Sequence, residues 1–130
     1  MKRGKYGFRT TAAAAALAAL VLAFSLVTTG CKSYWIDTSV ENQTGQPIHE
    51  LEVDYPTASF GTNTLAPGGV MHYRFQIRGS GPVKVEYTSP DGKTVHGQGL
   101  TLEERQQGEL GIRLLPQGKV EFLPKLQPGS

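Results

Sequence analysis

From residue 33 onward, the chain consists of short runs in which apolar and polar residues alternate, separated by turns that contain glycine or proline. The clearest run covers residues 70–78, where four apolar residues alternate with four polar ones. A repeat of two residues fits a strand with one buried face, whereas an amphipathic helix needs apolar residues three and four apart. Strands of this kind that recur every 8 to 12 residues or so predict an all-β domain.

We expect this domain to be an immunoglobulin-like β-sandwich of about seven or eight short antiparallel strands. The expected strands cover residues 33–42, 50–55, 58–65, 70–78, 83–87, 95–102, 110–114 and 120–123. A small β-barrel is the alternative, because the number of strands does not separate a sandwich from a closed barrel.

Glycine and proline add three local expectations. The strands at 70–78 and 83–87 flank a turn of glycine, serine and proline at 79–82, so we expect them to form a hairpin. Gly97 and Gly99 interrupt the run at 95–102, which indicates a bulge or the close approach of another segment. The end of the chain, from about residue 124, contains two prolines and is expected to fray.

Most aromatic residues of the domain fall in phase with the aliphatic ones. We therefore expect them to pack in the core rather than to form a sugar-binding platform. They are Tyr55, Tyr73, Phe75, Tyr87 and Phe122. Trp35 is out of phase and lies close to the only cysteine, Cys31, which favours a ring at a membrane interface over a ligand contact.

The first 30 residues have a different composition. A basic start is followed by an apolar, alanine-rich run over residues 12–27, and small residues then precede Cys31. The basic residues are Lys2, Arg3, Lys5 and Arg9. This order of basic, apolar and small residues is typical of a secretory signal peptide.

Residues 26–31, Leu-Val-Thr-Thr-Gly-Cys, resemble the lipobox of bacterial lipoproteins. In that family the third residue before the cysteine is usually leucine, and here it is Thr28. The resemblance implies cleavage before Cys31 and attachment of lipid to its thiol, so that residues 1–30 are a signal peptide and residues 31–130 a single anchored domain. Lys32 follows the cysteine where an aspartate would retain family members, which implies transport to the outer membrane, facing the periplasm, if the cell has one.

Two other interpretations of this segment stay open. It could be an uncleaved signal anchor, although its apolar run is shorter than the roughly 20 residues of a membrane-spanning helix. Alternatively, the signal could be cut elsewhere, which would leave Cys31 as a free thiol in an exported protein.

The charge of the exported part differs from that of the whole chain. The formal net charge is +2, but four of the thirteen basic residues lie in the first 30, and all eleven acidic residues lie after them. Residues 31–130 therefore carry a net charge of −2, which does not favour nucleic acid as a partner. A single cysteine also excludes a disulfide within the chain.

No catalytic pattern is evident in the sequence. His49, His72 and His96 lack the short spacing of metal ligands, and no serine lies in a Gly-x-Ser-x-Gly turn. Strand phase turns Glu50, Glu52 and Asp54 outward on one strand, where solvation keeps them ionised. We predict no enzyme activity and no cofactor.

The candidate interaction surface is basic and consists of His72, Arg74 and Arg78 on the strand at 70–78. If this strand neighbours the acidic strand at 50–55, the charges pair across strands and serve solubility and register. If the two strands lie in opposite sheets, the basic face is available to a partner or to anionic lipid.

Together with the strand pattern, the resemblance implies a membrane-anchored lipoprotein of the cell envelope that presents a small β-sandwich as a structural or protein-interaction module. Its partners would be the membrane, through the lipid on Cys31, and another envelope protein or wall polymer. The alternative is a periplasmic carrier of a small ligand or a metal ion.

Overall fold

The computed structural model describes residues 34–129. The expected signal peptide, Cys31 and Lys32 lie outside the described residues. The described residues form one compact unit. In the part of the chain that the structure describes, no helix has the length and hydropathy of a membrane span.

The secondary structure of the described residues consists of eight strands and one short 3-10 helix. In chain order they are β1 (Ile36–Asn42), β2 (Ile48–Tyr55), β3 (Ala58–Leu65), β4 (Val70–Phe75), β5 (Gly81–Thr88), β6 (Thr94–Leu102), β7 (Gln106–Leu115), η1 (Pro116–Gly118) and β8 (Lys119–Pro128). Each strand overlaps one of the alternating runs of the sequence, because the period of two residues directly reflects which face of a strand is buried.

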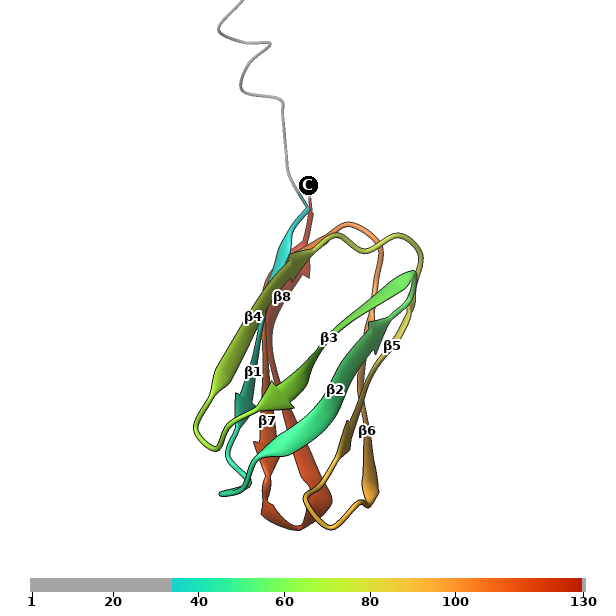
Figure 1. The fold of residues 1–130 in the computed structure, drawn as a ribbon. Coiled ribbons are helices and arrows are strands. Elements are labelled where there is room, and N and C mark those ends of the chain that lie inside the picture. Colours follow the sequence, from blue (N-terminus) through green and yellow to red (C-terminus); the bar gives the residue numbers. More distant parts are fainter. Residues whose placement is uncertain (1–33, 130) are drawn as a thin grey trace, which may run out of the picture. The chain divides into compact units, whose positions relative to one another are not determined.

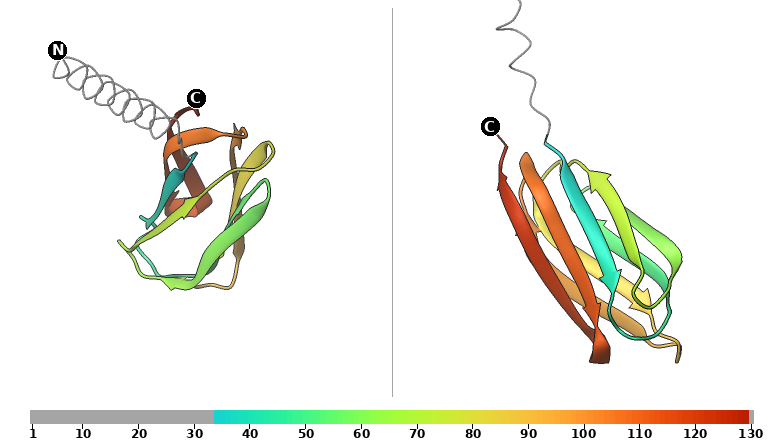
Figure 2. Two further views of the ribbon diagram at one scale, coloured as in Figure 1. Left: turned by 90° about the horizontal axis from the view of Figure 1, so that it is seen from above. Right: turned by 90° about the vertical axis from the view of Figure 1, so that its left-hand side faces the viewer.

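The strands form two four-stranded sheets that pack face to face (Figure 1). Sheet A has the order β4-β1-β7-β8, and sheet B has the order β3-β2-β5-β6. Figure 2 shows the two sheets as separate layers. The predicted β-sandwich is confirmed, and the alternative of a small barrel is wrong, since the two sheets do not close into one.

One strand pair departs from the expected antiparallel arrangement. β1 and β7 run parallel, with Ile36 opposite Gly108 and Val40 opposite Ile112, whereas the other pairs among the described strands are antiparallel. Parallel neighbours require a long crossover rather than a tight turn, and five strands separate β1 from β7 in the sequence. Alternation within one strand carries no information on the direction of a neighbour so distant.

The expected hairpin of β4 and β5 is wrong. β4 pairs with β1 at the edge of sheet A, and β5 pairs with β2 and β6 inside sheet B. Residues 76–80 therefore cross from one sheet to the other, and Ile77 is buried on the way with 4% of its surface exposed. A turn signal between two amphipathic strands is equally compatible with a hairpin and with a connection between facing sheets.

The expected fraying from residue 124 is also wrong. β8 continues to Pro128 and stays paired with β7, with Leu110 opposite Pro124 and Gln106 opposite Pro128. β8 lies at the edge of sheet A, where a residue without an N–H group can be tolerated.

The core lies between the sheets and is formed by their inward-facing aliphatic and aromatic residues. Its fully buried members include Ile36, Val53, Val85, Leu102 and Leu114. At the β3 and β4 edges, four aromatic rings close the gap between the sheets. Tyr55 stacks on Phe75 with centroids 4.1 Å apart, and Phe60 stacks on Tyr73 at 4.3 Å.

The prediction of a buried Tyr73 is wrong, because 44% of its surface is exposed, whereas Phe75 is buried as expected. Both side chains have the inward phase of β4. However, β4 is an edge strand, so Tyr73 has Phe60 on one side of its ring and solvent near the other.

The opposite side of the sandwich is closed by β6 and β8. A Cβ atom added to Gly99 would lie 2.6 Å from Cδ1 of Phe122, and one added to Gly97 would lie 2.8 Å from Cγ2 of Val120. The close approach predicted at these two glycines is therefore confirmed, and it lets the β8 side chains lie directly on the β6 backbone.

Candidate functional site

Arg74, the central residue of the predicted basic surface, lies on the outer face of sheet A. It is opposite Asp37 of β1, and its Nε lies 3.5 Å from Asp37 Oδ1. Its guanidinium also covers the ring of Trp35, with Cζ 4.8 Å from the ring centroid. Neither contact could be predicted from a local pattern, because Trp35 and Asp37 are far from Arg74 along the chain.

His72 lies on the same outer face, opposite Ser39. It lines a groove of about 380 Å³ together with Gly111 and Leu123. Ser39 and Gly111 are small residues at the same level of the adjacent strands β1 and β7, which leaves the middle of the sheet surface low. The groove is therefore a depression in the sheet face rather than an enclosed cavity.

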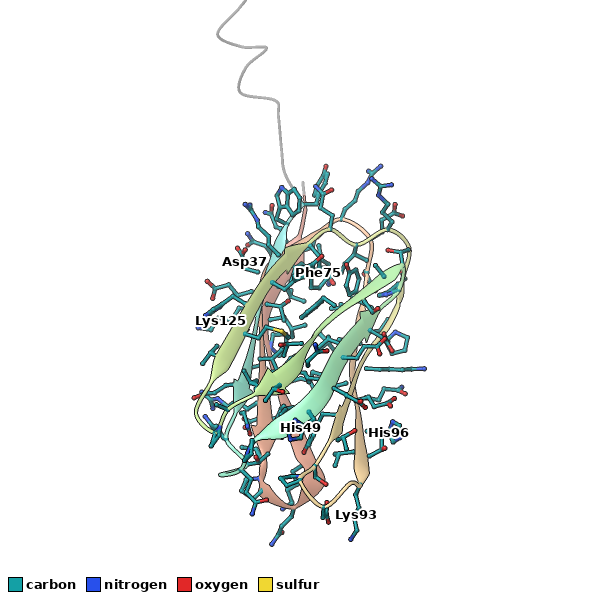
Figure 3. All side chains as sticks on the ribbon, viewed as in Figure 1. Asp37, His49, Phe75, Lys93, His96 and Lys125 are labelled. Carbon is teal, nitrogen blue, oxygen red and sulfur yellow. The ribbon has the colours of Figure 1, made fainter. Side chains whose placement is uncertain are left out.

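Charges of both signs surround this groove. On one side of the groove, Glu109 lies opposite Lys125, which Figure 3 labels. On the other side, Nε of Arg113 lies 4.0 Å from Oε2 of Glu41. The outer face of sheet A is consequently of mixed charge. Such exposed pairs contribute only about 0 to 1 kcal/mol each.

Arg78, the third residue of the predicted surface, lies beyond the end of β4. It lines a separate hollow of about 170 Å³ with Gln76, Glu104 and Arg105. The structure thus brings His72 and Arg74 onto one sheet face and places Arg78 near the loop that precedes β7.

The predicted acidic residues lie in the opposite sheet, since β2 belongs to sheet B and β4 to sheet A. Glu52 lies opposite Glu86 of β5. A hydrogen bond and the charge of Asp54, with a smaller contribution from Glu86, raise the pKa of Glu52 above its usual value. Lys84 lies opposite Asp54, and Nδ1 of His96 lies 3.4 Å from Glu86 Oε2.

The three histidines are dispersed over the domain. His49 is within 3.4 Å of the Thr64 hydroxyl, His96 contacts Glu86, and His72 lies on the other sheet. Figure 3 shows His49 and His96 at separate places. Among residues 34–129, no three histidine, aspartate, glutamate or cysteine side chains come close enough to share a metal ion.

A further hollow, of about 710 Å³, lies at the end of the sandwich formed by the β1–β2, β5–β6 and β7–β8 connections. None of the residues that line it was a candidate from the sequence. Those residues come from segments that the sequence indicates only as turns and strands, and no local pattern indicates that these segments meet.

Comparison with known proteins supports the fold and does not assign a family. No protein-family model matches the chain. No curated protein matches it either. The fold is similar to a solved structure described as "NMR structure of the protein from Eubacterium rectale", with a TM-score of 0.51 and 18% sequence identity, over 72% of this chain and 90% of that one. At this identity the similarity concerns the fold alone.

Proposed function

We propose that the chain is a lipid-anchored, non-enzymatic module of the bacterial cell envelope that presents a rigid β-sandwich to another envelope protein or to wall polymer. The observation that carries this proposal is the sequence itself, in which a basic and then apolar segment ends in the lipobox-like residues 26–31. β1 begins at Ile36, five residues after Cys31, so an anchor on this cysteine would hold the sandwich close to the bilayer.

The arrangement of polar groups supports binding rather than carriage of a metal ion. The histidines that a metal carrier would use are spread over both sheets. On the outer face of sheet A, Arg74 pairs with Asp37 and Arg113 with Glu41, and 58% of Arg74 and 64% of Asp37 are accessible. Exposed charges of both signs are typical of the polar rim of an interface.

The anchor can be tested by metabolic labelling with a palmitate analogue in the native host. Cys31→Ser should abolish the label and leave unprocessed precursor, because serine offers no thiol for the thioether. Thr28→Leu is the matched control, since it restores the residue usual in lipoboxes and should keep the label. Recovery of the native protein as a soluble, lipid-free species would contradict the proposal.

Localisation can be tested separately. In a host with two membranes, the native chain should fractionate with the outer membrane. Lys32→Asp should retain it in the inner membrane, because aspartate after the lipidated cysteine is the retention signal of the family. Outer-membrane fractionation of this variant would contradict the assigned role of Lys32.

The interaction surface requires its own test in the lipidated protein. Arg74→Glu with Arg78→Glu should leave the fold intact and reduce recovery of the envelope partner, if these residues belong to the binding face. Each reversal is also made alone, because Arg78 lies in a separate hollow beyond β4, and reversal at Arg74 also breaks its ion pair with Asp37. Lys119→Glu, an exposed reversal on β8, serves as the control. Unchanged recovery in both Arg variants would remove this surface from the proposal.

A further inference from the structure

The loop end of the sandwich carries a second candidate site, the hollow of about 710 Å³ described above. The β1–β2, β5–β6 and β7–β8 connections that line it lie at the end of the sandwich opposite to the first residues of β1 and the last residues of β8 (Figure 1). Its volume falls within the range of about 300 to 1,000 Å³ that is usual for small-molecule sites. We call it the loop-end hollow.

The inner wall of this hollow is mostly apolar and includes the hydroxyl group of Tyr87. Ile48 and Tyr87, with 1% and 2% of their surfaces exposed, form it together with the half-buried Val95 and Leu115. The Tyr87 phenol has no hydrogen-bonding partner among residues 34–129. Burial raises the pKa of Tyr87, so the group is a neutral hydroxyl at physiological pH. Among the described residues, the buried side-chain atoms without a partner include only the Thr38 hydroxyl, so the Tyr87 oxygen reaches the solvent of the hollow, where a ligand can hydrogen-bond to it.

The rim supplies further neutral hydrogen-bonding groups from three separate segments. Gln46 precedes β2, Thr94 begins β6, and Gln117 lies in η1. None of their side chains has a hydrogen-bonding partner in the described part of the chain. Gln46 is held in place from below, because Nδ2 of the buried Asn42 donates to its carbonyl at 2.7 Å.

The charged groups of the rim are already satisfied by one another. Nζ of Lys93 lies 3.7 Å from Asp91 Oδ2, and the Ser89 hydroxyl donates to the Asp91 carboxylate. That hydrogen bond, with the backbone and charge of Lys93, lowers the pKa of Asp91. One positive and one negative group that pair within the rim leave no net charge to attract an ionic ligand (Figure 3 labels Lys93).

We propose that the loop-end hollow binds a neutral saccharide chain. Sugar rings combine apolar C–H faces, which suit the half-buried Val95 and Leu115, with hydroxyl edges, which suit Tyr87 and the glutamine amides. An extended peptide fits less well, because the hairpins beside the hollow are paired to their last residues, Thr88 with Thr94 and Leu115 with Lys119. Peptide capture by strand addition needs an unpaired edge.

This inference rests on the proposed function only for its cellular setting, in which an anchored sandwich would present its loop end to wall polymer. The binding itself requires no lipid. Loss of acyl labelling would therefore leave the saccharide site untouched, and absence of saccharide binding would leave the anchor untouched.

The test is a titration of the purified full chain in detergent with chitotriose, followed by ¹H–¹⁵N NMR spectroscopy. We expect saturable shifts confined to amides near residues 44–48, 87–95 and 115–118, with a Kd between about 10 µM and 1 mM. Tyr87→Phe removes only the hydroxyl, and Gln46→Ala removes one amide. Each should weaken binding by about tenfold, the effect of one lost hydrogen bond.

Gln127→Ala is the matched control, since it makes the same change on β8 near the other end of the sandwich and should leave Kd unchanged. Maltotriose, a neutral saccharide without acetamido groups, tests whether binding requires the acetamido groups of chitotriose. Unchanged affinity in both Tyr87→Phe and Gln46→Ala would overturn the proposal. The absence of loop-end shifts with both saccharides at about 10 mM would also overturn it. Shifts at these loops with a peptide, but with neither saccharide, would do the same.

Discussion

Asn42 and Thr38 are the polar residues buried among the described residues, and their side chains are in opposite hydrogen-bonding situations. The Asn42 amide donates to the carbonyls of Gln46 and Leu65 and accepts from Thr44. The Thr38 hydroxyl, 2% exposed on β1, has no partner. The Asn42 side chain therefore stabilises the loop end, whereas the unsatisfied Thr38 hydroxyl destabilises the core.

Thr38→Val should stabilise the domain by about 1 kcal/mol, because it replaces an unsatisfied buried hydroxyl with a methyl group of similar shape. The midpoint of urea unfolding measures this effect. Thr101→Val, on the exposed face of β6, should change the midpoint much less. Lower stability in Thr38→Val would mean that the hydroxyl has a partner in solution.

Asn42→Asp should destabilise the domain by about 3 kcal/mol or more at neutral pH. The change places a carboxylate oxygen against two carbonyl oxygens in a site with no exposed surface. Burial raises the pKa of the introduced carboxyl in the folded state, so the folded state binds a proton more tightly than the unfolded state. The loss should therefore shrink as the pH falls from 7 towards about 4. Asn63→Asp, exposed on β3, is the control, and an equal loss there would contradict this account.

The residues Asn42-Gln43-Thr44 match a glycosylation sequon, and the same contacts give them a structural role. The Asn42 carboxamide is buried, and its oxygen accepts from the backbone N–H of Thr44 at 3.1 Å and from the Thr44 hydroxyl at 2.6 Å. The motif thus closes the turn between β1 and β2. The contacts with Thr44 and Gln46 are local, as in an Asx turn, whereas the contact with the Leu65 carbonyl, 23 residues away, could not be predicted from a local pattern.

At the scale of the strand, β4 tests the assignment of inward and outward faces. Phe75→Ala should cost about 3 to 5 kcal/mol, because Phe75 is buried and stacks on Tyr55. Arg74→Ala should change stability by about 0.5 kcal/mol or less, because its ion pair with Asp37 is exposed. Chemical denaturation of both variants measures the difference. A larger loss in Arg74→Ala would mean that the two faces of β4 are exchanged.

The contact of β6 with β8 depends on residues without side chains. Gly99→Ala should cost about 1 to 3 kcal/mol, because the new methyl group would meet the Phe122 ring near its point of attachment. Gly111→Ala is a matched control in sheet A, where the added Cβ would lie 3.4 Å from its nearest neighbour in Leu123. Thermal unfolding of the two variants should rank Gly99→Ala well below Gly111→Ala, and the reverse order would contradict the close approach.

Strand positions could be predicted from the sequence, whereas strand partners could not. Alternation records which residues of a strand are buried, and it placed Phe75, Val85 and Ile112 in the core. It says nothing of whether β4 pairs with β5 or with β1, or of the parallel pairing of β1 with β7. Edge positions are hidden for the same reason, so the exposure of Tyr73 and the order at Pro124 both depend on sheet topology.

For the whole molecule, the two sheets separate the acidic strand β2 from the basic residues of β4, yet neither arrangement foreseen from the sequence describes the result fully. Arg74 pairs across strands, but with Asp37 of β1 rather than with an acidic residue of β2. His72 and Arg74 share a sheet face, and Arg78 does not. A surface built from several strands needs the register of each pair before its charge can be assigned.

The loop-end hollow shows the same limit more strongly. Its polar groups come from Gln46, Tyr87, Thr94 and Gln117, on connections and strands far apart in the chain. Each residue has an ordinary local explanation as turn, core or strand end. Only the stacking of two sheets, which brings three connections to one end, makes them neighbours.

We propose that Cys31 becomes the lipidated first residue of an anchored sandwich. The most direct measurement is mass spectrometry of the mature protein purified from membranes of its native host. We predict a chain that begins at Cys31 and carries a diacylglyceryl group on the thiol, with residues 1–30 absent. A chain that retains residues 1–30, or one with a free thiol at Cys31, would contradict the account.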